Sequence, residues 1–134
     1  MTTHASGTFA VKLTPQTPTG KPEEATPGRM TIDKQFHGDL EATSKGEMLT
    51  ATTEIKGSAG YVAMERVSGT LHGRSGAFVL QHSGIMTRGV PQLAVTVVPD
   101  SGTGQLTGLA GNMEIKIADG KHFYEFAYTI SQTS

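Results

Sequence analysis

Alternation of apolar and polar residues with a period of two is the feature that most constrains the fold of this 134-residue chain. In the stretch SGTFAVKLT, Phe9, Val11 and Leu13 alternate with Thr8, Ala10 and Lys12, and RMTIDKQF repeats the pattern. Such a period is typical of strands with one buried face. The 17 glycines supply the positive φ angles that tight turns need. The chain therefore predicts short strands joined by tight turns, and no region favours a helix.

About nine segments read as strands: residues 6–14, 29–36, 41–55, 61–72, 75–86, 92–99, 104–108, 111–118 and 121–130. HGDL and KGSAG are predicted as connections, Asp119-Gly120 as a hairpin turn and Gly46 as a bulge. Strands that follow one another favour an antiparallel meander, and closing the meander into a barrel removes its exposed edges. We expect an all-β fold, a single antiparallel β-barrel of about eight to nine strands in one domain, residues 1–134.

The stretch PQTPTGKPEEATPG, residues 15–28, interrupts this pattern between the first two strands. It holds four of the six prolines and has no apolar period. Proline and glycine at this density indicate an exposed loop. The loop is either a plain connector or a lid.

Two stretches share one pattern of glycine and apolar residues. GTLHGRSGAF (69–78) and GQLTGLAGNM (104–113) match at an offset of 35 residues. If the match is not a coincidence, the inner Gly-x-x-Gly of each copy is a two-residue hairpin turn, with apolar residues facing each other across the hairpin. We therefore predict structural turn glycines at Gly69, Gly73, Gly76, Gly102, Gly104, Gly108 and Gly111.

The first copy predicts a hairpin that carries an acid and a base. With its turn at Arg74 and Ser75, Val67 would face His82, and Glu65 would lie diagonal to His82 on the same apolar face. In a cavity such a pair can move a proton, so both are candidate catalytic residues. The alternatives are a buried polar pair that satisfies itself and an ion pair at a subunit contact. The candidate ligand-binding residues around the pair are Val67, Leu71, Phe78, Leu80 and Tyr128.

Composition excludes several classes of partner. The net charge is −1, so neither nucleic acid nor a membrane is expected as a partner. There is no cysteine, and the five histidines form no H-x-H or H-E-x-x-H motif, so no metal site is predicted. The glycine segment after the strand at 92–99 is followed by another strand rather than a helix, which argues against a dinucleotide site, and no cofactor is expected. With no basic start or long apolar run, a cytoplasmic location is expected.

Residues Gly102, Gly104, Leu106, Gly108 and Gly111 in VVPDSGTGQLTGLAG resemble the glycine signature of the allene oxide cyclase and dirigent barrels. GYVAMERVSGTLHGRSGAFVLQHSG and GTGQLTGLAG are still more similar to an uncharacterised bacterial family, a domain of unknown function assigned to that superfamily. The resemblance implies an eight-stranded antiparallel barrel with an apolar cavity, often as a homo-oligomer. It implies no reaction.

Three functions are compatible with these observations. The first is binding of a small apolar or amphipathic molecule in the barrel lumen, with Glu65 and His82 as polar groups in an apolar wall. The second is a cofactor-free cyclase or isomerase that uses one of these residues to move a proton. The third is a structural homo-oligomer whose barrel is filled by side chains and has no cavity.

Overall fold

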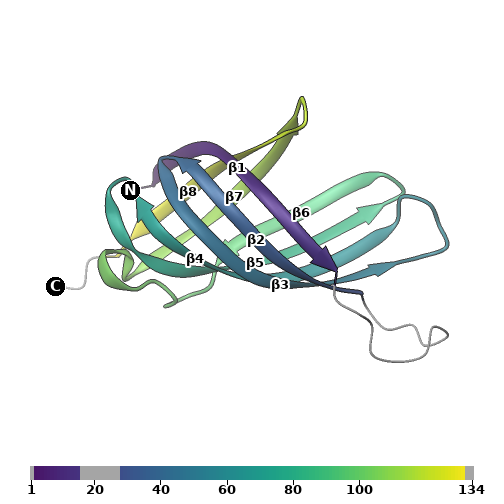
Figure 1. Cartoon of the computed structure of the whole chain (residues 1–134), viewed down its shortest axis with the longest axis horizontal. Helices are drawn as coiled ribbons and strands as arrows, with labels where there is room; N and C mark the ends of the chain where they lie inside the picture. Colours follow the sequence, from purple (N-terminus) through teal and green to yellow (C-terminus); the bar gives the residue numbers. More distant parts are fainter. Residues whose placement is uncertain (1, 16–27, 132–134) are drawn as a thin grey trace.

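The structure, a computed structural model, describes residues 2–15 and 28–131. They form one closed antiparallel barrel in which each strand pairs with its neighbours in sequence and β8 pairs with β1 (Figure 1). The strands are β1 (Thr3–Pro15), β2 (Gly28–Gly38), β3 (Leu40–Thr52), β4 (Ala59–Leu71), β5 (Arg74–Thr87), β6 (Val90–Val97), β7 (Leu109–Ala118) and β8 (Lys121–Ile130). The predicted all-β barrel is confirmed with eight strands. The ninth predicted strand, at 104–108, is wrong, because Gly104–Leu106 form a short 3-10 helix, η1.

Three hairpins of the barrel are closed by two-residue turns with both residues at positive φ. These turns are His72-Gly73, Arg88-Gly89 and Asp119-Gly120. This is the geometry of the type I′ turn, whose twist matches that of the strands it joins. The predicted turn at Asp119-Gly120 is confirmed.

The predicted turn at Arg74 and Ser75 is wrong by two residues. The β4–β5 hairpin turns at His72 and Gly73, so Leu71 pairs with Arg74. The physical reason is that the second turn position has φ +78, which Gly73 adopts without steric cost. A turn two residues later would have placed side chains at both positive φ positions.

The repeated glycine pattern does not form two similar hairpins. In the first copy Gly69 and Gly76 are paired inside strands β4 and β5, and in the second copy Gly111 lies inside β7. Of the seven predicted turn glycines, only Gly73 closes a hairpin. Gly102, Gly104 and Gly108 belong to the connection that contains η1. The strand glycines serve close backbone approach instead: a Cβ on Gly76 would lie 2.1 Å from the carbonyl oxygen of Thr103.

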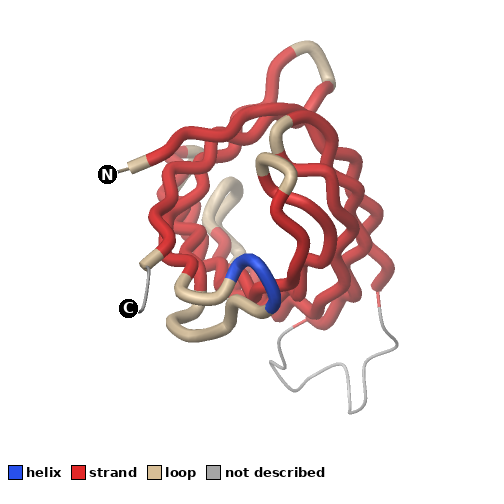
Figure 2. Tube along the Cα trace, turned by 90° about the vertical axis from the view of Figure 1, so that its left-hand side faces the viewer, coloured by secondary structure: helices blue, strands red, loops and turns tan. Residues whose placement is uncertain are grey.

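Apolar side chains fill one half of the barrel, which we call the packed half. It contains the β2–β3 and β4–β5 turns, and Leu106 of η1 is buried within it. Figure 2 faces this end, with η1 in blue at the rim. Its buried residues are Ala5, Phe9, Phe36, Leu40, Ala42, Val67, Leu71, Phe78, Leu80, Val95, Val97, Leu106, Leu109, Met113, Tyr124, Phe126 and Tyr128.

The opposite end of the barrel, which we call the open half, is less completely closed. It comprises the end of β3, the start of β4, the end of β5, the start of β6 and the end of β7. Strands β6 and β7 pair only at Thr96 and Asn112, and the β7–β8 hairpin rises away from β6 (Figure 1). Among the described residues, this seam is the weakest pairing in the ring.

Two further predictions concern single segments. The predicted loop at 15–28 is bounded by β1, which reaches Pro15, and β2, which starts at Gly28, and residues 16–27 lie outside the described residues. The bulge predicted at Gly46 is wrong, because β3 keeps an uninterrupted register with both neighbours through this residue. Gly46 instead lets β3 approach β4, since a Cβ there would lie 2.6 Å from the Cα of Glu65. Within the described residues, no helix is long and apolar enough to span a membrane.

Candidate functional site

A belt of polar side chains crosses the barrel interior between the two halves. Lys34 comes from β2, Ser44 from β3, Tyr61 and Glu65 from β4, and His82 from β5. Each lies on the strand face that is otherwise apolar and points inward. We call these five residues the polar belt.

The predicted proximity of Glu65 and His82 is confirmed. His82 Nε2 lies 2.6 Å from Glu65 Oε1, and both residues are buried. The register differs from the predicted one, since Glu65 pairs with Leu80 and His82 with Ala63. The predicted and the observed turn both have two residues, so the two pairings differ by an even number of residues and every side chain stays on its predicted face.

Glu65 is the centre of the polar belt. The ammonium of Lys34 donates to Glu65 Oε1 at 2.9 Å, and the hydroxyl of Ser44 donates to Oε2 at 2.5 Å. The carboxylate side chain has no exposed surface, and that of Lys34 is only 7% exposed. Lys34 Nζ also lies 5.0 Å from the ring centroid of Phe9, a cation–π contact. The belt is therefore a buried ion pair, and within the described residues no fully buried side-chain nitrogen or oxygen lacks a hydrogen-bond partner.

The environment holds Glu65 in its ionised form. Burial raises the pKa of this carboxyl group, but the hydrogen bond from His82, the charge of Lys34 and the Ser44 hydroxyl outweigh burial and lower the pKa to about 2. A buried carboxylate that lost one of these partners would be strongly destabilising. The partners of Glu65 thus decide whether the belt can persist inside the barrel.

Tyr61 connects the polar belt to the open half. Its hydroxyl lies 3.3 Å from His82 Nδ1. Its ring lies directly over Gly84 of β5, where a Cβ would come within 2.3 Å of Tyr61 Cε1. Burial, together with the charge of Glu65, raises the pKa of the phenol, so Tyr61 keeps its proton at neutral pH.

An apolar cavity of about 540 Å³ lies in the open half, with Tyr61 in its wall. Its lining comes from strands on both sides of the β6–β7 seam and is dominated by methionine, aliphatic and glycine residues. The lining residues are Met30, Met48, Thr50, Ala51, Thr52, Ala59, Gly60, Tyr61, Gly84, Ile85, Met86, Pro91, Gln92, Leu93 and Ile117. Through Tyr61, this cavity is one hydrogen bond away from His82.

The five predicted ligand-binding residues lie elsewhere. Val67, Leu71, Phe78, Leu80 and Tyr128 are all buried among the side chains of the packed half, and none belongs to the lining of the open-half cavity among the described residues. That they bind a ligand stays a prediction. The cavity lies at a different level of the barrel from these five residues. Alternation identifies the inward face of a strand, but it does not show at which level side chains fill the lumen.

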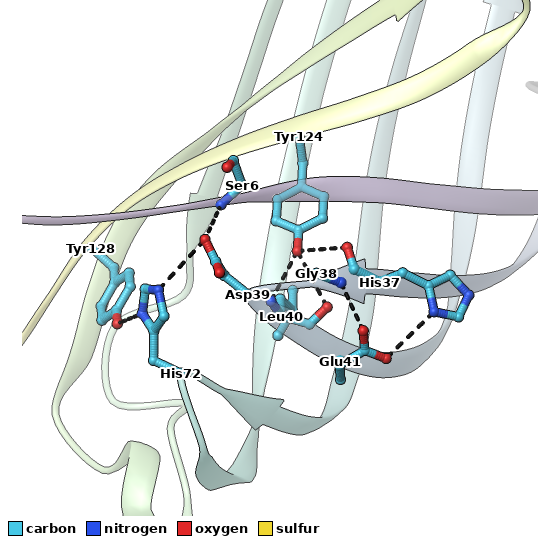
Figure 3. A network of polar contacts seen from close by, with 9 residues as sticks. All are labelled: Ser6, His37, Gly38, Asp39, Leu40, Glu41, His72, Tyr124 and Tyr128. Atoms are coloured by element: carbon cyan, nitrogen blue, oxygen red, sulfur yellow. Dashed lines mark hydrogen bonds and ion pairs between the residues drawn. The ribbon is translucent and has the colours of Figure 1, made fainter.

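Hydrogen bonds from side chains close the packed end of the barrel (Figure 3). The Tyr124 hydroxyl accepts a hydrogen bond from the Leu40 amide at 2.9 Å and shares its proton between the carbonyl oxygens of His37 and Leu40. Beside it, the Tyr128 hydroxyl lies 2.5 Å from His72 Nδ1. These contacts fasten the β2–β3 and β4–β5 turns to β8, which gives the tyrosines a structural role.

Sequence reasoning missed Lys34, Ser44 and Tyr61. A signal was present for two of them, because Lys34 shares its face with Ile32 and Phe36, and Tyr61 shares its face with Glu65. A lysine on an apolar strand face needs a buried anionic partner, and Glu65 was available.

Residues 5–128 match the model of a family described as "Protein of unknown function (DUF3224)". The chain is also similar to a protein of unknown function of this family from Shewanella oneidensis MR-1, whose crystal structure was determined at 1.84 Å resolution. The two sequences are 53% identical, the superposition covers 99% of this chain and 100% of that chain, and the TM-score is 0.93. No curated protein matches the chain.

Proposed function

The chain belongs to the DUF3224 family of proteins of unknown function, and from this premise we propose that it binds a small apolar or amphipathic molecule in the open half of the barrel. The observation that carries the proposal is the apolar cavity with a single phenol, Tyr61, connecting it to the polar belt. Its volume of about 540 Å³ is within the range of roughly 300–1,000 Å³ that small-molecule sites occupy.

Exposed apolar side chains at the cavity support this proposal. Leu93 is 45% exposed and Ile117 is 69% exposed, and they line the cavity from opposite sides of the β6–β7 seam. Their inward-facing neighbours further along the same strands, Val95 and Met113, are buried. A bound apolar molecule would remove Leu93 and Ile117 from water, with a gain of about 25 cal/mol for each Å² of apolar surface covered.

The test is native mass spectrometry of freshly purified protein, followed by extraction and identification of any small molecule that leaves on denaturation. We expect an apolar adduct in the wild-type protein. The variant Thr50→Trp places a large ring in the cavity and should abolish the adduct. Thr43→Trp, on the exposed outward face of the same strand, should retain it.

Addition of apolar probes gives a second readout when the purified protein is free of ligand. Menthol, decanol and decanoic acid should raise the thermal midpoint of the wild-type protein and of Thr43→Trp, but not that of Thr50→Trp. If none of these probes shifts the wild-type midpoint, or if Thr50→Trp responds like the wild type, the cavity is not the binding site.

The chain of hydrogen bonds from Tyr61 through His82 to Glu65 favours a second candidate, a cofactor-free isomerase or cyclase. A substrate carbon could pass a proton to the Tyr61 oxygen while Tyr61 passes its own proton to His82 Nδ1, and Glu65 would stabilise the imidazolium. Reversal at a different carbon would complete an isomerisation. Conversion of an enolisable terpenoid ketone by the wild-type protein but not by Tyr61→Phe would support this activity, and binding without conversion by protein in excess would count against it.

Three expectations from the sequence remain part of this proposal. They are a homo-oligomer, a cytoplasmic location and a relationship to the allene oxide cyclase and dirigent barrels. The native mass spectrum tests the first directly, because it counts the subunits. The cavity favours ligand binding over a purely structural barrel filled by side chains.

A further inference from the structure

The hydrogen-bond directions within the polar belt can be followed outward from Glu65. An ionised carboxylate only accepts hydrogen bonds. Lys34 and Ser44 donate to Glu65, and the contact of 2.6 Å between Glu65 Oε1 and His82 Nε2 therefore requires a proton on Nε2. This fixes one of the two nitrogens of the His82 ring as a donor.

Charge balance fixes the other nitrogen of His82. Within the described part of the chain, the charged groups at this ring are Glu65 from its own hairpin and Lys34 across the belt, and Tyr61 is the other titratable group in contact with it. Lys34 and Glu65 already balance each other's charge. A second proton on the imidazole would leave one uncompensated positive charge in a buried site, which is costly. A neutral ring with its proton on Nε2 leaves a lone pair on Nδ1.

Tyr61 must then donate to His82. Because Nδ1 is an acceptor, the contact of 3.3 Å is made by the phenol proton of Tyr61. The hydroxyl oxygen keeps lone pairs, and the structure records no other hydrogen bond to it within residues 2–15 and 28–131. The side chain also lines the cavity, so this oxygen is the acceptor available to a molecule bound there.

We propose that the Tyr61 oxygen is a hydrogen-bond acceptor that selects the ligand of the open-half cavity: an apolar molecule with a hydroxyl group is preferred over the matching ketone. The inference rests on the proposed binding function and adds the chemical class of the ligand. A ketone offers only acceptor atoms to the phenol oxygen. It could bind Tyr61 only if the phenol proton left His82 Nδ1, which would leave that nitrogen unpaired.

Menthol and menthone provide a matched test, because they share one carbon skeleton and differ in an alcohol against a ketone. Their dissociation constants are measured with the whole 134-residue chain at pH 8 by calorimetry. We expect menthol to bind about fivefold to tenfold more tightly, which is the effect of one net neutral hydrogen bond.

Tyr61→Phe is the decisive variant, because it keeps the ring against Gly84 and removes only the hydroxyl. We expect it to bind menthol and menthone with nearly equal affinity. Gly84→Ala is a second route to the same result, since the added methyl group would displace the Tyr61 ring. Ser83→Ala, the neighbouring change on the exposed face of β5, should keep the wild-type preference.

The outcomes separate this inference from the proposed function. If both compounds bind the wild-type protein equally, or if menthone binds more tightly, the cavity still binds ligands but Tyr61 does not select them as an acceptor. A preference for menthol that persists in Tyr61→Phe also overturns the inference. If neither compound binds and Thr50→Trp behaves like the wild type with every probe, the proposed function fails and the inference fails with it.

Discussion

The two halves of the barrel share the same eight strands but differ in what fills them. In the packed half, residues such as Phe78 and Phe126 stack with their ring centroids 5.9 Å apart, and both are almost completely buried. In the open half, Met86, Leu93 and Ile117 face the cavity and are 41–69% exposed. Close packing stabilises a fold, whereas an apolar cavity leaves part of that stabilisation unused.

From this difference we infer that the two halves have different roles, stability in the packed half and binding in the open half. The packed half supplies most of the buried apolar surface, which allows the open half to remain incompletely filled. The polar belt lies where the two halves meet, and only Tyr61 among its five residues reaches the cavity wall. We therefore expect substitutions in the packed half to change stability and substitutions in the open half to change binding.

The largest expected effect on stability comes from replacing a leucine with alanine, and we compare this change at one position in each half. Leu71→Ala removes a side chain with no exposed surface from the packed half and should lower the free energy of unfolding by about 2–5 kcal/mol. Leu93→Ala in the open half removes a side chain that is 45% exposed and should cost less than about 1 kcal/mol. Urea unfolding of both variants measures the difference, and equal losses would contradict the division into halves.

Acid should destabilise the polar belt, which lies between the two halves, by protonating Glu65. The pKa of Glu65 is lowered from 4.5 in the unfolded chain to about 2 in the folded protein, so its contribution is fully present above pH 4.5 and is lost as the pH falls towards 2. The loss over this window is about 3 kcal/mol. Unfolding curves at several pH values measure it.

Glu65→Gln provides the variant for this measurement. It should lower stability at neutral pH and flatten the dependence on pH between 4.5 and 2. Glu114→Gln, the same change at an exposed position on β7, should keep the wild-type slope. A wild-type slope in Glu65→Gln would show that other carboxyl groups cause the acid sensitivity.

The smallest expected change in stability comes from a substitution in the open half that should affect binding instead. Ile117→Ser should alter the free energy of unfolding by no more than about 0.5 kcal/mol, because this side chain is 69% exposed, but it should weaken the binding of menthol. Ile55→Ser makes the same change at a residue that is 53% exposed and outside the cavity lining, and it should leave binding unchanged. Equal affinities of the two variants for menthol would place the ligand away from the β6–β7 seam.

The fold and two of the five residues of the polar belt could be predicted, because both depend on the alternation of side chains along strands. Alternation assigns Glu65 and His82 to one face for any position of a two-residue turn, because moving such a turn changes the pairing by an even number of residues. Lys34 and Ser44 come from strands whose register with β4 depends on connections that the local pattern does not fix. The sequence shows on which strand face Lys34 and Ser44 lie, but it does not show that they reach the same height along the barrel axis as Glu65.

The η1 segment and the cavity were not predictable from the same pattern. Gly108 and Gly111 match the spacing of a hairpin turn, yet Gly111 lies inside β7, and the chain before Gly108 crosses the packed end, where Leu106 is buried against the core. That position depends on hydrogen bonds between Thr103 and Ala77, two residues far apart in sequence. The cavity likewise depends on where β6 and β7 separate, which is a property of the closed ring rather than of either strand.

The pairing of β6 with β7 at Thr96 and Asn112 alone has a mechanical consequence. Because so few hydrogen bonds join β6 to β7, we expect these two strands to separate more easily than any other pair. The circumference of the open half can then change while the seven other ladders keep their registers. Widening the mouth therefore requires little more than a change in the angle between β6 and the β7–β8 hairpin. We therefore expect the proposed binding site to accept molecules of different width, with the packed half as a rigid base.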